Sequence, residues 1–159
     1  MSALHMIWKG VVKMSRILIV GGQGSGKTTF SKALAEKTKL PLIHLDKLYW
    51  TDNWTARSRE EFDELLEKEL HKPDWIIDGN FQRTLPHRLK YADTVIVFDF
   101  PRIKCIWGAF SRAVKNLGKS RSDMGGNCPE RIDFKFYKTI WTKKTVLKPL
   151  KRYKEKMSE

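Results

Sequence analysis

The sequence of 159 residues predicts one α/β domain in which helices cover both faces of a parallel sheet. The apolar runs at 16–20, 75–78 and 94–100 do not alternate with polar residues, which is typical of strands buried on both faces. Helical patterns separate these runs along the chain. A glycine-rich segment, residues 21–28, joins the first run to a helical pattern. These observations together predict three layers, α/β/α.

Apolar periodicity and capping residues predict the remaining elements. Ser58 and Glu61 have the spacing of a capping box. In order, we expect a helix at 27–37, a strand at 41–45 ending at Asp46, a helix from Ser58 to Pro73, strands at 75–78 and 94–100, a helix at 102–117 and a last helical stretch through Trp141 and Leu147. The helix at 102–117 carries apolar residues on one side, and we expect Trp107 there, like Trp141, to belong to the core.

Residues 21–28 read Gly-Gly-Gln-Gly-Ser-Gly-Lys-Thr and have the spacing of a phosphate-binding loop, called the phosphate loop below. Its glycines allow backbone N–H groups to surround phosphates at the positive end of the following helix. Lys27 is expected to reach the β and γ phosphates, and the Thr28 hydroxyl to hold Mg²⁺. A turn that binds nothing is the alternative, which the flanking strand and helix disfavour. The residues expected to bind ATP or GTP are Gly22, Gln23, Gly24, Ser25, Gly26, Lys27, Thr28 and Thr29.

The net charge of +13 is concentrated in the last third of the chain. Residues 102–159 hold 16 Lys and Arg against 5 Asp and Glu, a balance of +11, whereas residues 1–101 hold 15 against 13. Such a segment can be a nucleic-acid surface, a set of arginines around polyphosphate, or a solvated helical face. Composition does not choose among these.

The sequence also makes predictions about location and boundaries. No apolar stretch is long enough to cross a bilayer, and the N-terminus lacks a signal-peptide pattern. The two cysteines, Cys105 and Cys128, lack metal-ligand spacing, and we interpret them as free thiols in a reducing compartment. We therefore expect a cytoplasmic protein with no membrane partner. Met14 directly precedes the first strand of the sheet. We therefore expect residues 1–13 to be a non-native or dispensable extension and 14–159 to be the single domain.

Several motifs resemble those of a known family. They are the phosphate loop, Ile43-His44-Leu45-Asp46, the run Asp78-Gly79-Asn80-Phe81-Gln82-Arg83-Thr84, Val97-Phe98-Asp99-Phe100-Pro101-Arg102, and Arg121-Ser-Asp-Met124 with Cys128-Pro-Glu-Arg131. Over residues 16 to about 145 the chain resembles the P-loop nucleoside monophosphate kinase-like enzymes. It is most similar to the small adenylate-kinase-related proteins labelled "topology modulation protein".

The resemblance implies a P-loop NTPase fold with sheet order 2-3-1-4-5 and a small mobile lid, here at about 118–131. No fifth strand is found after Lys148, which leaves strand four as an unprotected edge. Either the reading frame is truncated or another segment covers this edge. The candidate for the second option is residues 6–12.

Two carboxylates follow expected strands. Asp78 ends the strand expected beside the first one, and in this class a carboxylate at that place orients the Mg²⁺ shell; a simple turn residue is the alternative. Asp46 can accept the proton of an attacking hydroxyl, or else cap a helix. Asp99 resembles a structural aspartate of the related proteins, and we do not expect it to bind metal. Tyr49, Trp50 and Trp54 can stack on a flat acceptor or complete the core.

Five arginines are expected around the acceptor and the lid. Arg83 falls in a segment that resembles the acceptor-phosphate-binding stretch of adenylate kinases, although one residue longer, and Arg88 is the substitute. Arg112 and Arg121 are expected to stabilise the transferred phosphoryl group, and Arg131 to bind substrate. For each, a solvated surface arginine is the alternative.

The function expected from these residues is Mg²⁺-dependent phosphoryl transfer from ATP to a small acceptor, a nucleotide or another metabolite. The chain would then be an adenylate-kinase-related phosphotransferase. The alternative is a nucleotide-regulated, DNA-associated topology modulation protein that uses the basic C-terminal third. No helix-turn-helix, zinc or RNA-binding signature supports that alternative.

Overall fold

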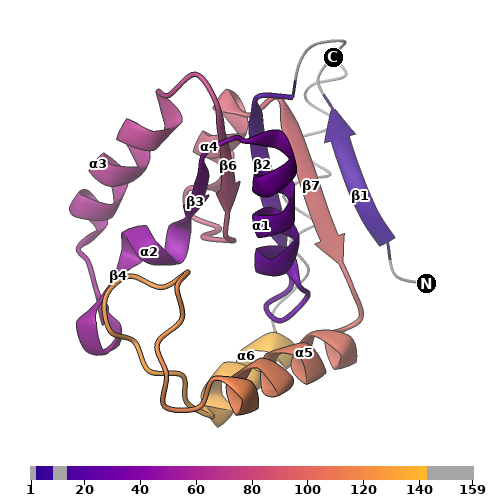
Figure 1. Ribbon diagram of the computed structural model, residues 1–159, viewed down its shortest axis with the longest axis vertical. Helices are drawn as coiled ribbons and strands as arrows, with labels where there is room; N and C mark the ends of the chain where they lie inside the picture. Colours follow the sequence, from indigo (N-terminus) through magenta and orange to yellow (C-terminus); the bar gives the residue numbers. More distant parts are fainter. Residues whose placement is uncertain (1–2, 9–13, 143–159) are drawn as a thin grey trace.

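The computed structural model describes residues 3–8 and 14–142, with side chains from 14 onward. The chain forms a five-stranded sheet with helices on both faces (Figure 1). The sheet order is β1-β7-β2-β6-β3. The strands are β1 (Ala3–Trp8), β2 (Arg16–Gly21), β3 (Leu42–His44), β6 (Trp75–Asp78) and β7 (Thr94–Asp99). Strands β2, β3, β6 and β7 are parallel to one another. Numbered 1 to 4 along the chain, these four strands lie in the predicted order 2-3-1-4.

The fifth strand of the sheet comes from the N-terminal segment. β1 pairs antiparallel with β7, from Ala3 opposite Asp99 to Trp8 opposite Thr94. This pairing covers the edge that the sequence leaves open, although with residues 3–8 instead of the expected 6–12. Whether residues 1–13 are dispensable stays a prediction.

Removal of the N-terminal segment tests that prediction. A chain that begins at Met14 uncovers the N–H and C=O groups of β7, and unpaired edges promote association. The lost backbone hydrogen bonds are worth about 1 kcal/mol each, and the entropy regained by the removed segment offsets most of this sum. We therefore expect a net loss of about 2 kcal/mol of stability and a melting temperature lower by about 4–8 °C. Thermal unfolding and light scattering measure both effects. An unchanged melting temperature and a monomeric preparation would show that the extension is dispensable.

The helices are α1 (Lys27–Thr38), α2 (Leu45–Tyr49), α3 (Arg59–Leu70), α4 (Leu85–Tyr91), α5 (Arg102–Lys115) and α6 (Phe134–Thr142). Helix α1 covers one face of the sheet and helices α3 and α4 cover the other, whereas α5 and α6 lie beyond the carboxyl ends of the strands (Figure 1). Ile17 and Ile19 pack on the α1 side, whereas Leu18 and Val20 pack on the side of α3 and α4. Successive residues of β2 therefore enter different cores, which explains the missing polar alternation.

Two local predictions have different outcomes. The capping box is present, with the Ser58 hydroxyl accepting from the Glu61 N–H and the Glu61 carboxylate accepting from the Ser58 N–H. The strand expected at 41–45 ends earlier, at His44, and residues 45–49 form α2. Leu45, Leu48 and Tyr49 have the i, i+3, i+4 spacing of a helix face and pack on the core. Asp46 therefore lies in the first turn of a helix and not at a strand end.

The expected core face of α5 is wrong. Trp107 is exposed, together with Ile103, Phe110 and Val114, while the small side chains of Cys105, Ala109 and Ala113 are buried. Trp141 of α6 is exposed as well, and Leu147 lies outside the described residues. The reason is steric, because α5 packs closely against the phosphate loop and only small side chains fit between them.

The segment expected to be a lid, residues 118–131, packs on a small hairpin. This hairpin consists of β4 (Trp50–Thr51), the short 3₁₀ helix η1 (Asp52–Trp54) and β5 (Thr55–Ala56). The Trp54 indole N–H donates to the Pro129 carbonyl at 2.9 Å, and the Asn53 N–H donates to the Asn127 carbonyl at 2.9 Å. The mobility of the lid stays a prediction. Among the residues from 14 to 142, no helix has the length and apolar character needed to cross a bilayer.

Candidate nucleotide and acceptor site

The phosphate loop lies where the sequence places it, between the end of β2 and the start of α1. Gly24 and Gly26 have positive φ angles of 79° and 90°, which favour glycine. Lys27 is buried, and its ammonium group donates to the Gly22 carbonyl at 2.7 Å. Burial lowers the pKa of Lys27, and the charges of Asp78 and Asp46 act in the opposite direction. A buried ammonium group without a full set of acceptors is suited to bind phosphate oxygens.

Helix α5 forms the outer wall of this loop. A Cβ atom on Gly22 would lie 2.7 Å from the Cys105 sulfur, and one on Gly24 would overlap the Cys105 carbonyl. On the other side, a Cβ atom on Gly108 would overlap the Gly24 carbonyl. Sequence reasoning missed this contact. The available signal was the run of small residues, Cys105, Gly108 and Ala109, within an otherwise bulky helix.

Substitution of Gly108 by alanine tests the contact. Alanine favours a helix by about 1 kcal/mol over glycine, so helix propensity alone predicts a more stable protein. We expect instead that the displaced Gly24 carbonyl distorts the phosphate loop and weakens ATP binding by about tenfold or more, as calorimetry can measure. Ser111→Ala, on the same helix, is the matched control. Unchanged ATP affinity in G108A would show that the close approach has no role in nucleotide binding.

Thr28 and Asp78, the two residues predicted to hold Mg²⁺, contact each other in the structure. The Thr28 hydroxyl donates to Asp78 Oδ2 at 2.9 Å, which joins the first turn of α1 to the end of β6. The same carboxylate oxygen lies 3.4 Å from the Ser31 hydroxyl and 3.2 Å from His44 Nδ1. A hydroxyl and one carboxylate beside a phosphate site are the oxygen ligands that Mg²⁺ uses with nucleotides. In the described part of the chain no cluster of three or more His, Cys, Asp or Glu forms a separate metal cage.

Asp46 differs from Asp78 in its surroundings. Asp46 is half-buried and lines the same cavity as Lys27, and its carboxylate has no hydrogen-bond or ion-pair partner in the described part of the chain, whereas its backbone carbonyl accepts from the Trp50 N–H. Burial raises the pKa of Asp46, and the charge of Asp78 raises it further. Such a carboxylate can accept a proton, whereas Asp78 is held by Thr28, Ser31 and His44. A side-chain capping bond from Asp46 is not present, since the N-cap position of α2 is His44.

A single cavity of about 1130 Å³ connects these groups. Seven of the eight residues expected to bind nucleotide line it, and Ser25 does not. Tyr49, Trp50 and Trp54 line the cavity and also pack on one another edge to face, with ring centroids 4.8 and 5.6 Å apart. Both expected roles, packing and presentation to a ligand, are compatible with this placement.

Sequence reasoning did not identify Asn80 as a residue of this site. Its side-chain oxygen accepts from the Gly21 N–H at 2.9 Å.

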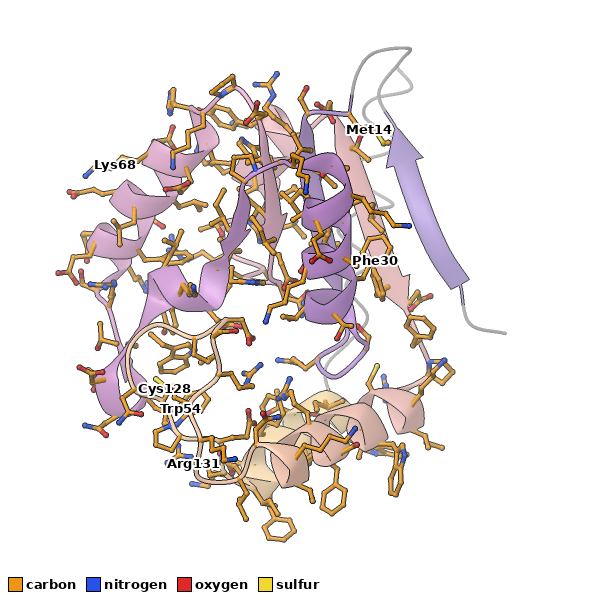
Figure 2. All side chains as sticks on the ribbon, viewed as in Figure 1. Met14, Phe30, Trp54, Lys68, Cys128 and Arg131 are labelled. Atoms are coloured by element: carbon orange, nitrogen blue, oxygen red, sulfur yellow. The ribbon has the colours of Figure 1, made fainter. Side chains whose placement is uncertain are left out.

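Three of the five arginines reach the cavity. Arg112 and Arg121 line it and are paired with Glu130, at 3.5 and 2.6 Å, and Arg121 also contacts Asp123 at 2.6 Å. The guanidinium of Arg131 lies 5.8 Å from the ring centroid of Trp54 (Figure 2). The lid arginines therefore face the cavity with their charge partly neutralised by lid carboxylates. Phosphate oxygens are competing acceptors for the same donors.

The other two arginines do not fit the expected role in acceptor binding. Arg83 lies outside the cavity and forms two hydrogen bonds of 2.8 and 2.6 Å with Asp63 at the surface. Arg88 is fully buried and donates to the carbonyls of Gly79 and Phe81 at 3.0 Å, and to that of Asn80. Burial lowers the pKa of Arg88 to about 9. Its two terminal guanidinium nitrogens hold the turn after β6, and Arg88 does not line the cavity.

Comparisons with known proteins bear on the fold that carries this site. Residues 17–79 match the family model described as "ATPase family associated with various cellular activities (AAA)". No curated protein matches the chain. A solved structure of a "putative kinase" from Chloroflexus aurantiacus J-10-fl is similar, with 20% identity, a TM-score of 0.52, and coverage of 84% of this chain and 82% of that chain. The phosphate loop, the parallel sheet and this structural likeness show that the chain has a P-loop NTPase-like α/β fold.

Proposed function

We propose that the chain is a Mg²⁺-dependent phosphotransferase, related to adenylate kinases, that transfers the γ-phosphoryl group of ATP to a small acceptor. The observation that carries the proposal is the placement of Asp46. This carboxylate has no partner among the described residues and lines the same cavity as Lys27 and the Thr28–Asp78 pair. A protein that only binds nucleotide has no need of a free carboxylate facing the phosphates. A nucleotide or another small metabolite remains the proposed acceptor.

At the nucleotide end, the phosphate loop and Lys27 would bind the β and γ phosphates. Thr28 and Asp78 would hold Mg²⁺, which neutralises phosphate charge when bound. Arg112 and Arg121 would stabilise charge on the transferred group, after exchanging their carboxylate partners for phosphate oxygens. Positioning and charge stabilisation would therefore supply most of the catalysis.

At the acceptor end, Asp46 would accept the proton of the attacking hydroxyl. A bond forms between the acceptor oxygen and the γ phosphorus, and the bond from that phosphorus to the β–γ bridging oxygen breaks. ADP leaves with the bridging oxygen. Arg131, with the rings of Trp54, Trp50 and Tyr49, would form the wall against which the acceptor is oriented.

A screen for nucleotide consumption tests the proposal. ADP or GDP release is measured with ATP or GTP across nucleoside monophosphates, nucleosides and small hydroxylated metabolites. We expect acceptor-dependent release with at least one compound and incorporation of labelled phosphate into it. Absence of acceptor-dependent release throughout, from folded protein that binds ATP, would contradict transfer activity.

The nucleic-acid alternative has less support from the residues around the site. Arg112 and Arg121, two cations of the basic C-terminal third, are paired with Glu130 and directed toward the cavity. They are therefore not part of a free basic surface.

The cytoplasmic location expected from the sequence stays a prediction.

A further inference from the structure

Helix α5 presents a continuous apolar stripe on its outer side. Its members Ile103, Trp107, Phe110 and Val114 are separated by four, three and four residues, which places them on one face of the helix, and Leu117 follows just beyond the end of α5, in a β-bridge with Glu130. Their exposed fractions are 73% for Ile103, 69% for Trp107, 40% for Phe110, 52% for Val114 and 58% for Leu117. Large apolar side chains gathered on one face in this way mark an interaction site.

Helix α6 extends the apolar character of this end of the molecule. It packs beside α5 (Figure 1), and the rings of Phe110 and Tyr137 lie 6.5 Å apart. Two more aromatic side chains of α6, Phe134 and Trp141, are exposed by 82% and 52%. We call the five stripe residues with Phe134 and Trp141 the α5–α6 surface.

The charges on the two helices have one sign. Neither α5 nor α6 contains an aspartate or glutamate. Arg112 is paired with Glu130 at the cavity, whereas Lys104 and Lys115 lie on the polar flank of the stripe. The remaining cations of the two helices are Arg102, Lys135 and Lys138. A partner that suits this face has to be apolar and negatively charged together.

We propose that the α5–α6 surface binds an anionic lipid membrane in a peripheral manner. A helix with Trp, Phe and aliphatic side chains on one face and flanking Lys or Arg lies in the membrane interface, with the apolar face among the acyl chains. Anionic headgroups attract the cations, each contributing about 1 kcal/mol. A second copy would bring two purely basic helices together. A nucleic acid would satisfy the cations but leave Ile103, Val114 and Leu117 in water.

The proposed membrane-binding surface and the nucleotide site lie on opposite faces of α5. Cys105 and Ala109 face the phosphate loop, whereas Ile103 and Trp107 face away from it. The nucleotide cavity therefore lies on the side of α5 that the membrane would not touch. The absence of a spanning helix, on which the expectation of no membrane partner rested, does not bear on binding at the surface.

Vesicle co-sedimentation of the full chain tests the proposal. The probes are vesicles of phosphatidylcholine alone and of phosphatidylcholine mixed with phosphatidylglycerol, at low and high salt. We expect binding to the anionic vesicles, weakened by salt, and little binding to the neutral ones. Ile103→Ser with Trp107→Ser is expected to reduce binding by about tenfold or more, because burial of these side chains is lost.

A pair of charge variants distinguishes vesicle binding by this particular surface from binding that depends only on the net charge of the protein. The first variant, Lys104→Glu with Lys115→Glu, reverses the charge beside the apolar stripe. The second, Lys37→Glu with Lys68→Glu, changes the net charge by the same amount elsewhere. Figure 2 shows Lys68 on α3, far from α5. The proposal predicts weaker vesicle binding for the first variant only. It is overturned if anionic vesicles do not bind at low salt, if both charge variants bind equally, or if I103S/W107S binds like the wild type. Light scattering that shows a dimer abolished by I103S/W107S, or tighter binding of single-stranded DNA than of vesicles, would assign the surface to those partners instead.

Discussion

Lys27→Ala is expected to lower the rate of phosphoryl transfer by about 10²–10³-fold, the cost of removing one preorganised donor to a reacting phosphoryl group. Lys27 is buried inside the phosphate loop, where its ammonium group donates a hydrogen bond to the Gly22 carbonyl. Burial lowers the pKa of Lys27 because desolvation disfavours the ammonium charge, although the charges of Asp78 and Asp46 act in the opposite direction; a bound phosphate would likewise favour the charged form. We therefore expect ATP binding to weaken as well, while the melting temperature without nucleotide changes little.

Steady-state kinetics and ATP calorimetry measure these two effects. Lys37→Ala, in the last turn of the same helix, removes an exposed lysine and is the matched control. We expect this control to behave like the wild type. Wild-type turnover and ATP affinity in K27A would show that the loop does not bind phosphate in the proposed manner.

Asp46→Asn is expected to lower kcat by about 10²–10⁴-fold, the usual contribution of a general base, while ATP affinity stays close to the wild-type value. Asparagine has nearly the same shape but cannot take up the acceptor's proton at neutral pH. The pKa of Asp46 is raised, first by burial and then by the charge of Asp78. Since the base must be ionised, the wild-type rate should fall on acidification at a pH above the usual aspartate range.

The pH profile of kcat distinguishes this role from a structural one. The acid limb should be present in the wild type and in Asp63→Asn, a surface control whose carboxylate is paired with Arg83, and absent in D46N. An acid limb that remains in D46N would assign that ionisation to another group. A loss of ATP binding in D46N would indicate that Asp46 supports the nucleotide site instead.

The sequence predicted the features that depend on local patterns. The phosphate loop is recognisable because its spacing directly determines the backbone geometry around Lys27. The parallel strands are recognisable because burial on both faces leaves continuous apolar runs, as in β2 and β7. The Ser58 capping box is equally local. Each of these features is determined by a segment of fewer than about ten residues.

The errors concern features that depend on tertiary contacts. The apolar periodicity of α5 identified an amphipathic helix, but periodicity does not say which side meets the rest of the protein. The phosphate loop requires small side chains at Cys105 and Ala109, so the bulky side faces outward. Similarly, Arg83 has Asp63 as its partner, 20 residues away, and Arg88 is held by backbone carbonyls that no motif reveals.

Calorimetry of the wild-type chain with ATP and Mg²⁺ tests the central claim most directly. The claim is that residues 21–28 bind a nucleoside triphosphate. We predict saturable heat, and in parallel a melting temperature raised by about 5–10 °C when the ATP concentration is about 100 times Kd, with both effects reduced in K27A. Folded wild-type protein that gives neither heat nor thermal protection with ATP or GTP would contradict the claim.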